Sequence, residues 1–428
     1  MPTAAPSFSE LFRTFGRIGL INFGGPAGQI ALMHRELVEE RKWVSENDYL
    51  HALNFCHLLP GPEAQQLATY IGWKLHGVRG GLAAGLLFIL PGALVMLVLS
   101  IFYAFAAHLQ WFAALFLGVK AAVLAIVVQA LIRIAGRALK TQFQKLLAAA
   151  AFVGLFVFSL PFPLIILSAG ALGMVFGPKS LEVSAVVPSA GPDWRGTIKT
   201  VLVWLIIWAA PMALIAATLG QANEFWKIGV FFSKLAVVTF GGAYAVLAYM
   251  AQEAVHGFHW LRPGEMVDGL GLAETTPGPL IMVSQFVGFL AAFRAPAPFS
   301  PLIAGVIGAI LTTWVTFAPC FLWIFTCAPW IERLQHARRL KNGLAAVTAA
   351  VVGVIANLTV WFAVHVLFLR TSTITLGAFE LALPDPASLD WRAASLALLA
   401  ALLLFRIKLG VIKVLGLACL GGFALSFV

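Results

Sequence analysis

The sequence repeats itself at a fixed spacing of 217 residues, and this repeat limits the possible folds more than any other feature. Residues 23–62 match residues 240–279 without a gap at twelve of forty positions. The matches include Phe-Gly-Gly at 23–25 and 240–242 and Pro-Gly-Pro at 60–62 and 277–279. Agreement in a single register indicates an internal duplication, so we expect two halves of the same construction.

The chain is too apolar for water to be its main solvent. Of its 428 residues, 61% are hydrophobic and 11% are charged, and the mean hydropathy is +0.93. A soluble domain is about half apolar and a quarter charged. A bilayer core roughly 30 Å thick needs about 20 mostly apolar residues per helix. The apolar runs therefore predict an all-α membrane protein, with spans near 81–105, 111–136, 198–219, 301–326 and 343–369 and helical hairpins at 146–176 and 393–427.

Basic residues predict how the two halves are oriented. The net charge of +10 is concentrated in short loops, which indicates membrane topology rather than a nucleic-acid partner. One basic cluster follows the second span of the first half, whereas the other precedes the equivalent span of the second half. The clusters are Arg133, Arg137, Lys140 and Lys145, and Arg333, Arg338, Arg339 and Lys341. Because basic loops face the cytoplasm, equivalent loops should lie on opposite sides, as in two inverted repeats.

This reasoning divides the chain into three segments. We expect a first repeat at residues 1–145, connecting transmembrane helices and a linker at 146–224, and an inverted second repeat at 225–428. The stretch 177–199, rich in Pro, Ser and Gly, is typical of an inter-half linker.

Each half also contains breaks in segments too short to cross a bilayer. Residues 24–26 and 60–62 interrupt the short apolar segments 8–23 and 49–59, which predicts broken or re-entrant short helices. Paired interruptions in corresponding positions indicate a transport site. A helix that restarts after such a break presents unpaired N–H groups and a positive dipole end to an anion. Alternatively, these small residues serve close helix packing.

Cationic side chains near the breaks could neutralise such an anion. Arg17 and Lys234 are equivalent in the repeat and lie in apolar helices, where a lone cation costs about 3 kcal/mol and so favours a partner. They could supply two positive charges to a dianion, or extend from helix ends to the membrane surface. Arg35 could bind the anion with Glu36 as its counter-charge, or belong to a solvated face. Lys120 also lies within a span, as a relay group or as a satisfied polar residue.

The residues expected to bind substrate share a position at a break, on the helix that follows it, or at a cation before it. They are Arg17, Gly24, Gly25, Pro26, Gln29, Arg35, Glu36, Pro60, Gly61, Pro62, Gln65, Lys234, Gly241, Gly242, Pro277, Gly278, Pro279 and Gln285. Gln65 and Gln285 follow the Pro-Gly-Pro breaks and can donate hydrogen bonds to oxyanion oxygens, although polar helix packing explains them equally well.

The sequence contains no pattern typical of catalysis or of metal binding. Its four cysteines, Cys56, Cys320, Cys327 and Cys419, lack metal-ligand spacing and lie in apolar surroundings. We find no nucleophile–base pair and no phosphate loop. We therefore expect no enzyme activity, no metal and no cofactor, and a channel-like conduit stays open as an alternative to a carrier.

The stretch from FGGPAGQIALMHRELVEERKW to LLPGPEAQQLATYIG, with its echo FGGAYAVLAYM through ETTPGPLIMVSQFVG, resembles the chromate transporter family in its long, two-domain form. The resemblance runs from about Phe12 to Leu369. The family's motifs fall on ten residues: Gly24, Gly25, Pro26, Arg35, Glu36, Trp43, Pro60, Gly61, Pro62 and Gln65. Members often have His at the third position after Gly-Gly-Pro, where this chain has Gln29.

The resemblance implies secondary transport of chromate outward across the bacterial plasma membrane, and hence chromate resistance. Sulfate or another oxyanion is the alternative substrate, because sulfate has the same shape and charge. The partners implied are the anion and the lipid bilayer, with no nucleic acid, and a homodimer stays open as the assembly.

Overall fold

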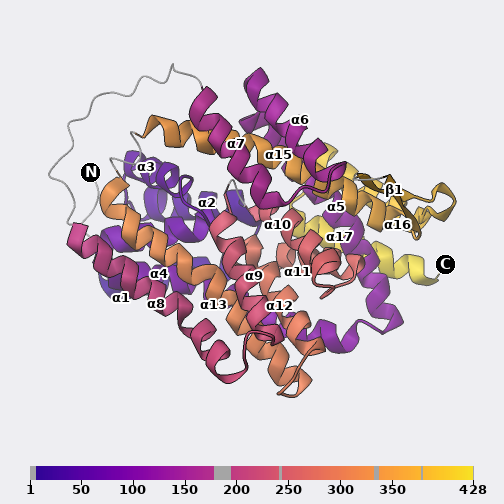
Figure 1. Ribbon diagram of the computed structural model, residues 1–428, viewed down its shortest axis with the longest axis horizontal. Helices are drawn as coiled ribbons and strands as arrows, with labels where there is room; N and C mark the ends of the chain where they lie inside the picture. Colours follow the sequence, from indigo (N-terminus) through magenta and orange to yellow (C-terminus); the bar gives the residue numbers. More distant parts are fainter. Residues whose placement is uncertain (1–5, 178–193, 241–242, 332–336, 377–378, 428) are drawn as a thin grey trace. The chain divides into compact units, whose positions relative to one another are not determined.

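The computed structural model describes residues 6–177, 194–240, 243–331, 337–376 and 379–427. Gly241, Gly242, Arg333 and most of the predicted linker at 177–199 lie outside these ranges. The helices of the first half are α1 (Phe8–Ile21), α2 (Gly25–His34), α3 (Glu46–Cys56), α4 (Glu63–Ala106), α5 (Gln110–Ala138), α6 (Gln142–Phe156) and α7 (Phe162–Phe176). Those that follow are α8 (Trp194–Thr218), α9 (Glu224–Val238), α10 (Ala243–Gln252), α11 (Pro263–Thr275), α12 (Val283–Arg294), α13 (Pro301–Cys327), α15 (Arg338–Leu367), α16 (Trp391–Ala401) and α17 (Val411–Ala424) (Figure 1).

The predicted all-α membrane architecture is confirmed. Within the described ranges, five helices are long and apolar enough to cross a membrane: α4, α5, α8, α13 with the turn that follows it, and α15. The sequence predicted the first span only from residue 81, whereas α4 starts at Glu63 and continues through non-helical backbone at His76 and Gly77. None of the residues of α8 is buried, so this apolar helix, which packs against α13 on one side, has a face open to lipid.

The contacts divide the chain into two compact units that interleave along the sequence. Unit 1 comprises Met1–Ser100, Pro178–Ala243 and Thr276–Lys341, and unit 2 comprises Ile101–Gly177, Tyr244–Thr275 and Asn342–Val428. Each unit therefore draws on both halves of the duplication. The division at residues 145 and 224 concerns the repeats rather than these units, and it stays a prediction.

Small residues allow close helix packing within each unit. In unit 1, α13 packs against α12, α9 and α8, and at Gly288 a side chain would collide with Thr312. In unit 2, α5 packs against α16 and α17, and a side chain at Gly118 would collide with the backbone of Ala418. Such contacts replace the hydrophobic driving force that lipid cannot supply.

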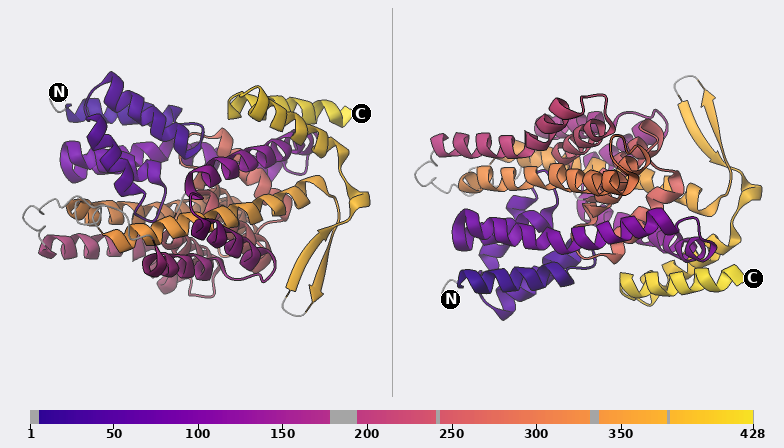
Figure 2. Two further views of the ribbon diagram at one scale, coloured as in Figure 1. Left: turned by 90° about the horizontal axis from the view of Figure 1, so that it is seen from above. Right: turned by 90° about the horizontal axis from the view of Figure 1, so that it is seen from below.

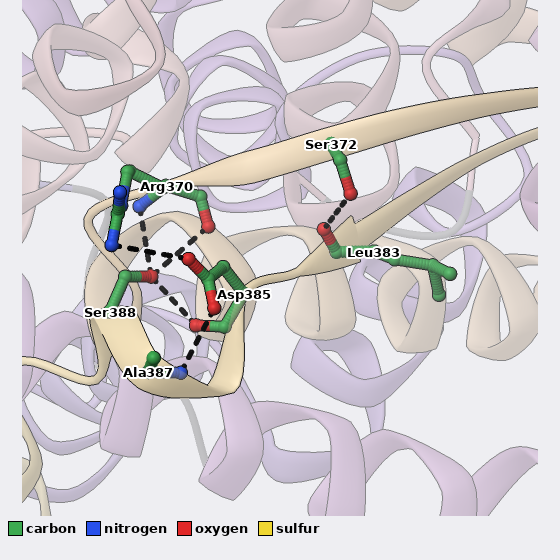
Figure 3. A network of polar contacts seen from close by, with 6 residues as sticks. All are labelled: Arg370, Ser372, Leu383, Asp385, Ala387 and Ser388. Carbon is green, nitrogen blue, oxygen red and sulfur yellow. Dashed lines mark hydrogen bonds and ion pairs between the residues drawn. The ribbon is translucent and has the colours of Figure 1, made fainter.

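A β-hairpin that the sequence analysis did not predict follows α15 in unit 2. Strands β1 (Thr371–Leu376) and β2 (Phe379–Pro384) pair antiparallel, and they stand clear of the helices of unit 2 in both views of Figure 2. Polar contacts close the base of the hairpin (Figure 3): Arg370 and Asp385 form an ion pair at 3.3 Å, and the Ser388 hydroxyl donates to the Asp385 carbonyl at 2.7 Å. Four of the five residues at 371–375 are β-branched, which is the sequence signal for a strand.

Four helical hairpins in the described chain share one connecting geometry. Each joins two helices through a non-glycine residue in the left-handed region, and the next residue donates its N–H to a carbonyl six residues earlier. The left-handed residues are Lys42, Ser159, His259 and Lys408, with φ of 56°, 48°, 56° and 57°. The hydrogen bonds are Trp43 to Leu37, Leu160 to Gly154, Trp260 to Ala254 and Leu409 to Leu403, at 2.8–3.0 Å. Lys42 and His259 are equivalent at the 217-residue spacing, so the duplication extends to backbone conformation at these two connections.

The left-handed position at Lys408 gives a test of this geometry. We expect Lys408→Val to be less stable than Lys408→Gly by about 1–2 kcal/mol, because a β-branched residue is strained at positive φ. Thermal unfolding of the purified protein in detergent measures the difference. The matched pair is Lys413→Val and Lys413→Gly at an exposed position of α17, where glycine should be the less stable variant. The same order at both positions would contradict the assignment.

Candidate functional site

The Phe-Gly-Gly break of the first half leaves a helix start without a side-chain cap. Helix α1 ends at Ile21 and α2 begins at Gly25. Gly24 and Gly25 have φ of 92° and 69°, and no atom of the described residues lies within 4 Å of the place a Cβ would occupy at either residue. Glycine is therefore required here by backbone conformation and not by space. Pro26 stands in the first turn, and no side chain caps the helix, so its first N–H groups have no partner within α2.

The helix start after the first Pro-Gly-Pro break is electrostatically different. Helix α4 begins at Glu63, directly after Pro62, and its first turn carries this carboxylate. Glu63 also faces His57 at 3.2 Å. A carboxylate already occupies the positive end of this helix, whereas the first turn of α2 contains no acidic residue. Of these two starts, α2 is the better site for an external anion.

The two kinds of break are hydrogen-bonded to each other in a reciprocal pattern. The Gly61 N–H, in the Pro-Gly-Pro of the first half, donates to the Thr239 carbonyl at 2.8 Å, just before the Phe-Gly-Gly of the second half. The Gly278 N–H donates to Asn22, to Oδ1 at 2.6 Å and to the carbonyl at 3.4 Å. Asn22 and Gly61 are the repeat equivalents of Thr239 and Gly278. Each Pro-Gly-Pro break is thus bound to the residue that precedes the other half's Phe-Gly-Gly motif, and all four residues lie in unit 1.

Gln29 connects the same two segments. Its buried Nε2 donates to the carbonyl of Asn22 at 3.1 Å and to that of Gly278. Its Oε1 is buried and has no hydrogen-bond partner among the described residues. The amide holds the junction together, so Gln29 is a structural residue of the break as well as a predicted binding residue.

The glutamines that follow the Pro-Gly-Pro breaks also donate within the protein. Gln65 Nε2 donates to the Thr69 hydroxyl at 2.9 Å, and Gln285 Nε2 donates to the Ala93 carbonyl at 2.9 Å. Both side chains are buried, and their Oε1 atoms have no hydrogen-bond partner in the described part of the chain. A carbonyl oxygen repels an anion, which leaves backbone N–H groups and cations as the donors expected to hold one.

The cations near the break are paired differently from the sequence expectation. Arg17 and Arg41 both face the fully buried Glu36, at 3.6 and 3.7 Å. Arg35 instead pairs with Glu40 at 3.6 Å, on an exposed surface. The expected partner of Arg17 therefore exists, and it is Glu36. The Arg17 side chain is 59% exposed, and Lys234, its repeat equivalent on α9, is exposed too.

Sequence reasoning missed Asn22 and Thr239 as members of this junction. Both are fully buried or nearly so, at 0% and 1% exposure. The signal was available, because a polar residue ends an apolar segment directly before Phe-Gly-Gly in both halves. Among the described residues no group of three or more His, Cys, Asp or Glu side chains is placed to hold a metal ion.

The junction predicts different outcomes for two equivalent substitutions. Asn22→Ala should lower the free energy of unfolding by about 1–3 kcal/mol, because it removes the 2.6 Å acceptor of a buried N–H. Thr239→Ala should cost less, because Gly61 donates to the Thr239 backbone carbonyl, which alanine retains. Thermal unfolding in detergent compares the two. Equal losses would show that the Asn22 side chain does not carry the junction.

Comparison with known proteins identifies the family. The family described as Chromate transporter matches residues 9–174 and again residues 226–423. The chain is 33% identical to a chromate transport protein of Pseudomonas aeruginosa, over 87% of this chain and 84% of that protein. It is 28% identical to a chromate transport protein of Cupriavidus metallidurans, over 82% of each. These relatives are transport proteins rather than enzymes. No solved structure matches. The two matches account for most of the sequence, and the chain belongs to the chromate transporter family.

Proposed function

We propose that this multi-pass membrane protein is a secondary transporter that exports chromate across the bacterial plasma membrane and so confers chromate resistance. The observation that carries the proposal is the reciprocal hydrogen bonding of the helix breaks in a chain of this family. Non-helical backbone in a membrane is tolerated where it is buried or lines a cavity. In this chain the start of α2 and the second Pro-Gly-Pro motif, which both adjoin non-helical backbone, lie in the same compact unit.

In this proposal chromate binds at the helix starts that follow the breaks. The uncapped start of α2 offers N–H groups and no competing carboxylate, which suits a tetrahedral oxyanion. Gly241 and Gly242 would supply the equivalent start in the second half. Arg17 and Lys234 would neutralise the two charges, with Glu36 holding Arg17 until the anion arrives. The two halves, as inverted repeats, would alternate access to the site by rocking against each other.

The membrane potential is sufficient to drive this export. Moving a dianion out of a cell at about 100 mV, negative inside, gains roughly 4.6 kcal/mol. This free energy supports a concentration gradient of about a thousandfold. ATP hydrolysis is not needed.

Flux measurements test the proposed substrate and direction. Everted vesicles should take up chromate with saturation, faster when the vesicle interior is positive. Unlabelled sulfate should compete weakly. Strong competition would favour a general carrier of divalent oxyanions, and uptake without saturation would favour a channel.

The two equivalent cations give a mutational test. Replacing Arg17 and Lys234 together with Gln should abolish protection of cells against chromate, because the dianion loses both counter-charges. The control is Arg13→Gln with Lys227→Gln, which removes one cation from each of the same two helices and should retain protection. Membrane levels of both variants are compared by immunoblot. Wild-type protection by the first variant would remove Arg17 and Lys234 from the site.

A further inference from the structure

A second group of buried charges lies on α11 in unit 2. The Asp268 carboxylate accepts a hydrogen bond from the Tyr103 hydroxyl, at 2.7 Å to Oδ2. Its other oxygen, Oδ1, faces the Lys120 ammonium at 3.5 Å. The three side chains come from the end of α4, from α5 and from α11. Lys120, which the sequence placed alone inside a span, therefore has an acidic partner.

Burial makes the charge of Asp268 depend on its neighbours. Helix α11 is not among the helices long enough to cross a bilayer, and its Asp268 is 4% exposed. Desolvation raises the pKa of this carboxyl to about 6, and Lys120 and Tyr103 oppose the rise. At pH 7 the group is mostly ionised while both partners are in place. Loss of the lysine charge partner raises the proton affinity further.

Asp268 has few charged neighbours among the residues that the structure describes. Besides Lys120 and Tyr103, Glu265 on the same helix acts on the carboxylate and favours its protonated form. Helix α17 also packs against α11, and its titratable side chains are Lys413, which is exposed, and Cys419. Lys120 is thus the principal counter-charge.

The two members of the ion pair differ in their freedom to move. The Lys120 side chain is 29% exposed, whereas that of Asp268 is 6% exposed. A lysine has a flexible four-carbon stem, so its ammonium can turn away while the carboxylate stays buried. An ionised carboxylate left there without its partner is strongly disfavoured and takes up a proton instead. Oδ1, the atom that would accept it, has no hydrogen-bond partner among the described residues.

We propose that Asp268 is a proton-binding site coupled to anion transport: it is ionised while Lys120 faces it, and it takes up a proton when Lys120 turns away as the anion is carried. The proton comes from the compartment that supplies the anion and adds to Oδ1. Proton and anion then bind together and move in the same direction, one proton per anion. This inference rests on the proposed chromate transport and adds the coupled ion. One net negative charge, rather than two, then crosses per dianion, so the electrical driving force for export is half of that calculated above for the dianion alone.

A pH gradient at zero membrane potential tests the coupling. Everted vesicles are given a medium one pH unit more acid than their interior, with the potential clamped by valinomycin and equal potassium on both sides. Wild-type protein should accumulate chromate inside, up to about tenfold for one coupled proton. With Asp268→Asn, chromate should equilibrate across the membrane without accumulating. The small accumulation caused by protonation of chromate itself is the same for every variant and is subtracted.

The matched control is Glu274→Gln. Glu274 is a second buried carboxyl of α11, and it accepts a hydrogen bond from a tyrosine hydroxyl, that of Tyr244, at 2.7 Å. This variant should retain the gradient-driven accumulation. Loss of accumulation in Glu274→Gln with retention in Asp268→Asn would overturn the proposal.

The remaining outcomes separate the coupling from the transport on which it rests. Saturable chromate flux in wild type that does not depend on the pH gradient would overturn the coupling and leave the proposed function. Accumulation of chromate under the opposite pH gradient would have the same consequence. Absence of any chromate flux overturns both. If Asp268→Asn fails to reach the membrane, Tyr103→Phe replaces it. Loss of its hydroxyl should raise the pH at which flux is half-maximal, and an unchanged midpoint would overturn the proposal.

Discussion

The structure of unit 1 depends on how the backbone groups at the interrupted helices are satisfied. In an apolar environment an unpaired N–H or carbonyl costs several kcal/mol, so a break is stable only if something replaces the missing helical hydrogen bonds. Here the replacement is reciprocal: the Gly61 and Gly278 N–H groups each bond to the residue that ends a helix segment in the other half. Gln29 adds a side-chain amide to one of the two junctions. The breaks are thus held in place by one another, and the start of α2 is left with N–H groups to offer.

The sequence was sufficient to predict features that depend on local pattern. Apolar length predicted the spans, and the repeat predicted that breaks would occur twice at equivalent positions. The family resemblance rested on the same motifs. The left-handed residues Lys42 and His259 differ in type yet adopt the same φ. The type of a single residue is therefore not enough to predict this connection, because the helices on either side determine its backbone conformation.

Long-range pairing was beyond the sequence. Glu36 could have paired with its neighbour Arg35, but it turns to Arg17 and Arg41 while Arg35 reaches Glu40. The pairing of Glu36 depends on which side of the helix faces the protein interior. Helix α2 continues into a π-helical turn at Arg35–Glu40, and this turn changes the direction in which the side chains of Arg35 and Glu36 point. The β-hairpin at 371–384 was not predicted, because its β-branched residues, three threonines and Ile374, form a stretch far shorter than the apolar segments on either side. Buried carboxylates on α11 were missed for a related reason, since their partners lie on α4, α5 and α10.

The reciprocal junction also bears on how the chain is made. The acceptor of the Gly61 N–H, at Thr239, is synthesised about 180 residues after it. At roughly 5–20 residues per second, the ribosome takes on the order of ten to forty seconds to supply that carbonyl. If the first half enters the lipid during this interval, the Gly61 N–H has no acceptor yet, because the Thr239 carbonyl belongs to the second half. The nascent first half must therefore keep this glycine near water or against the insertion machinery until its counterpart emerges.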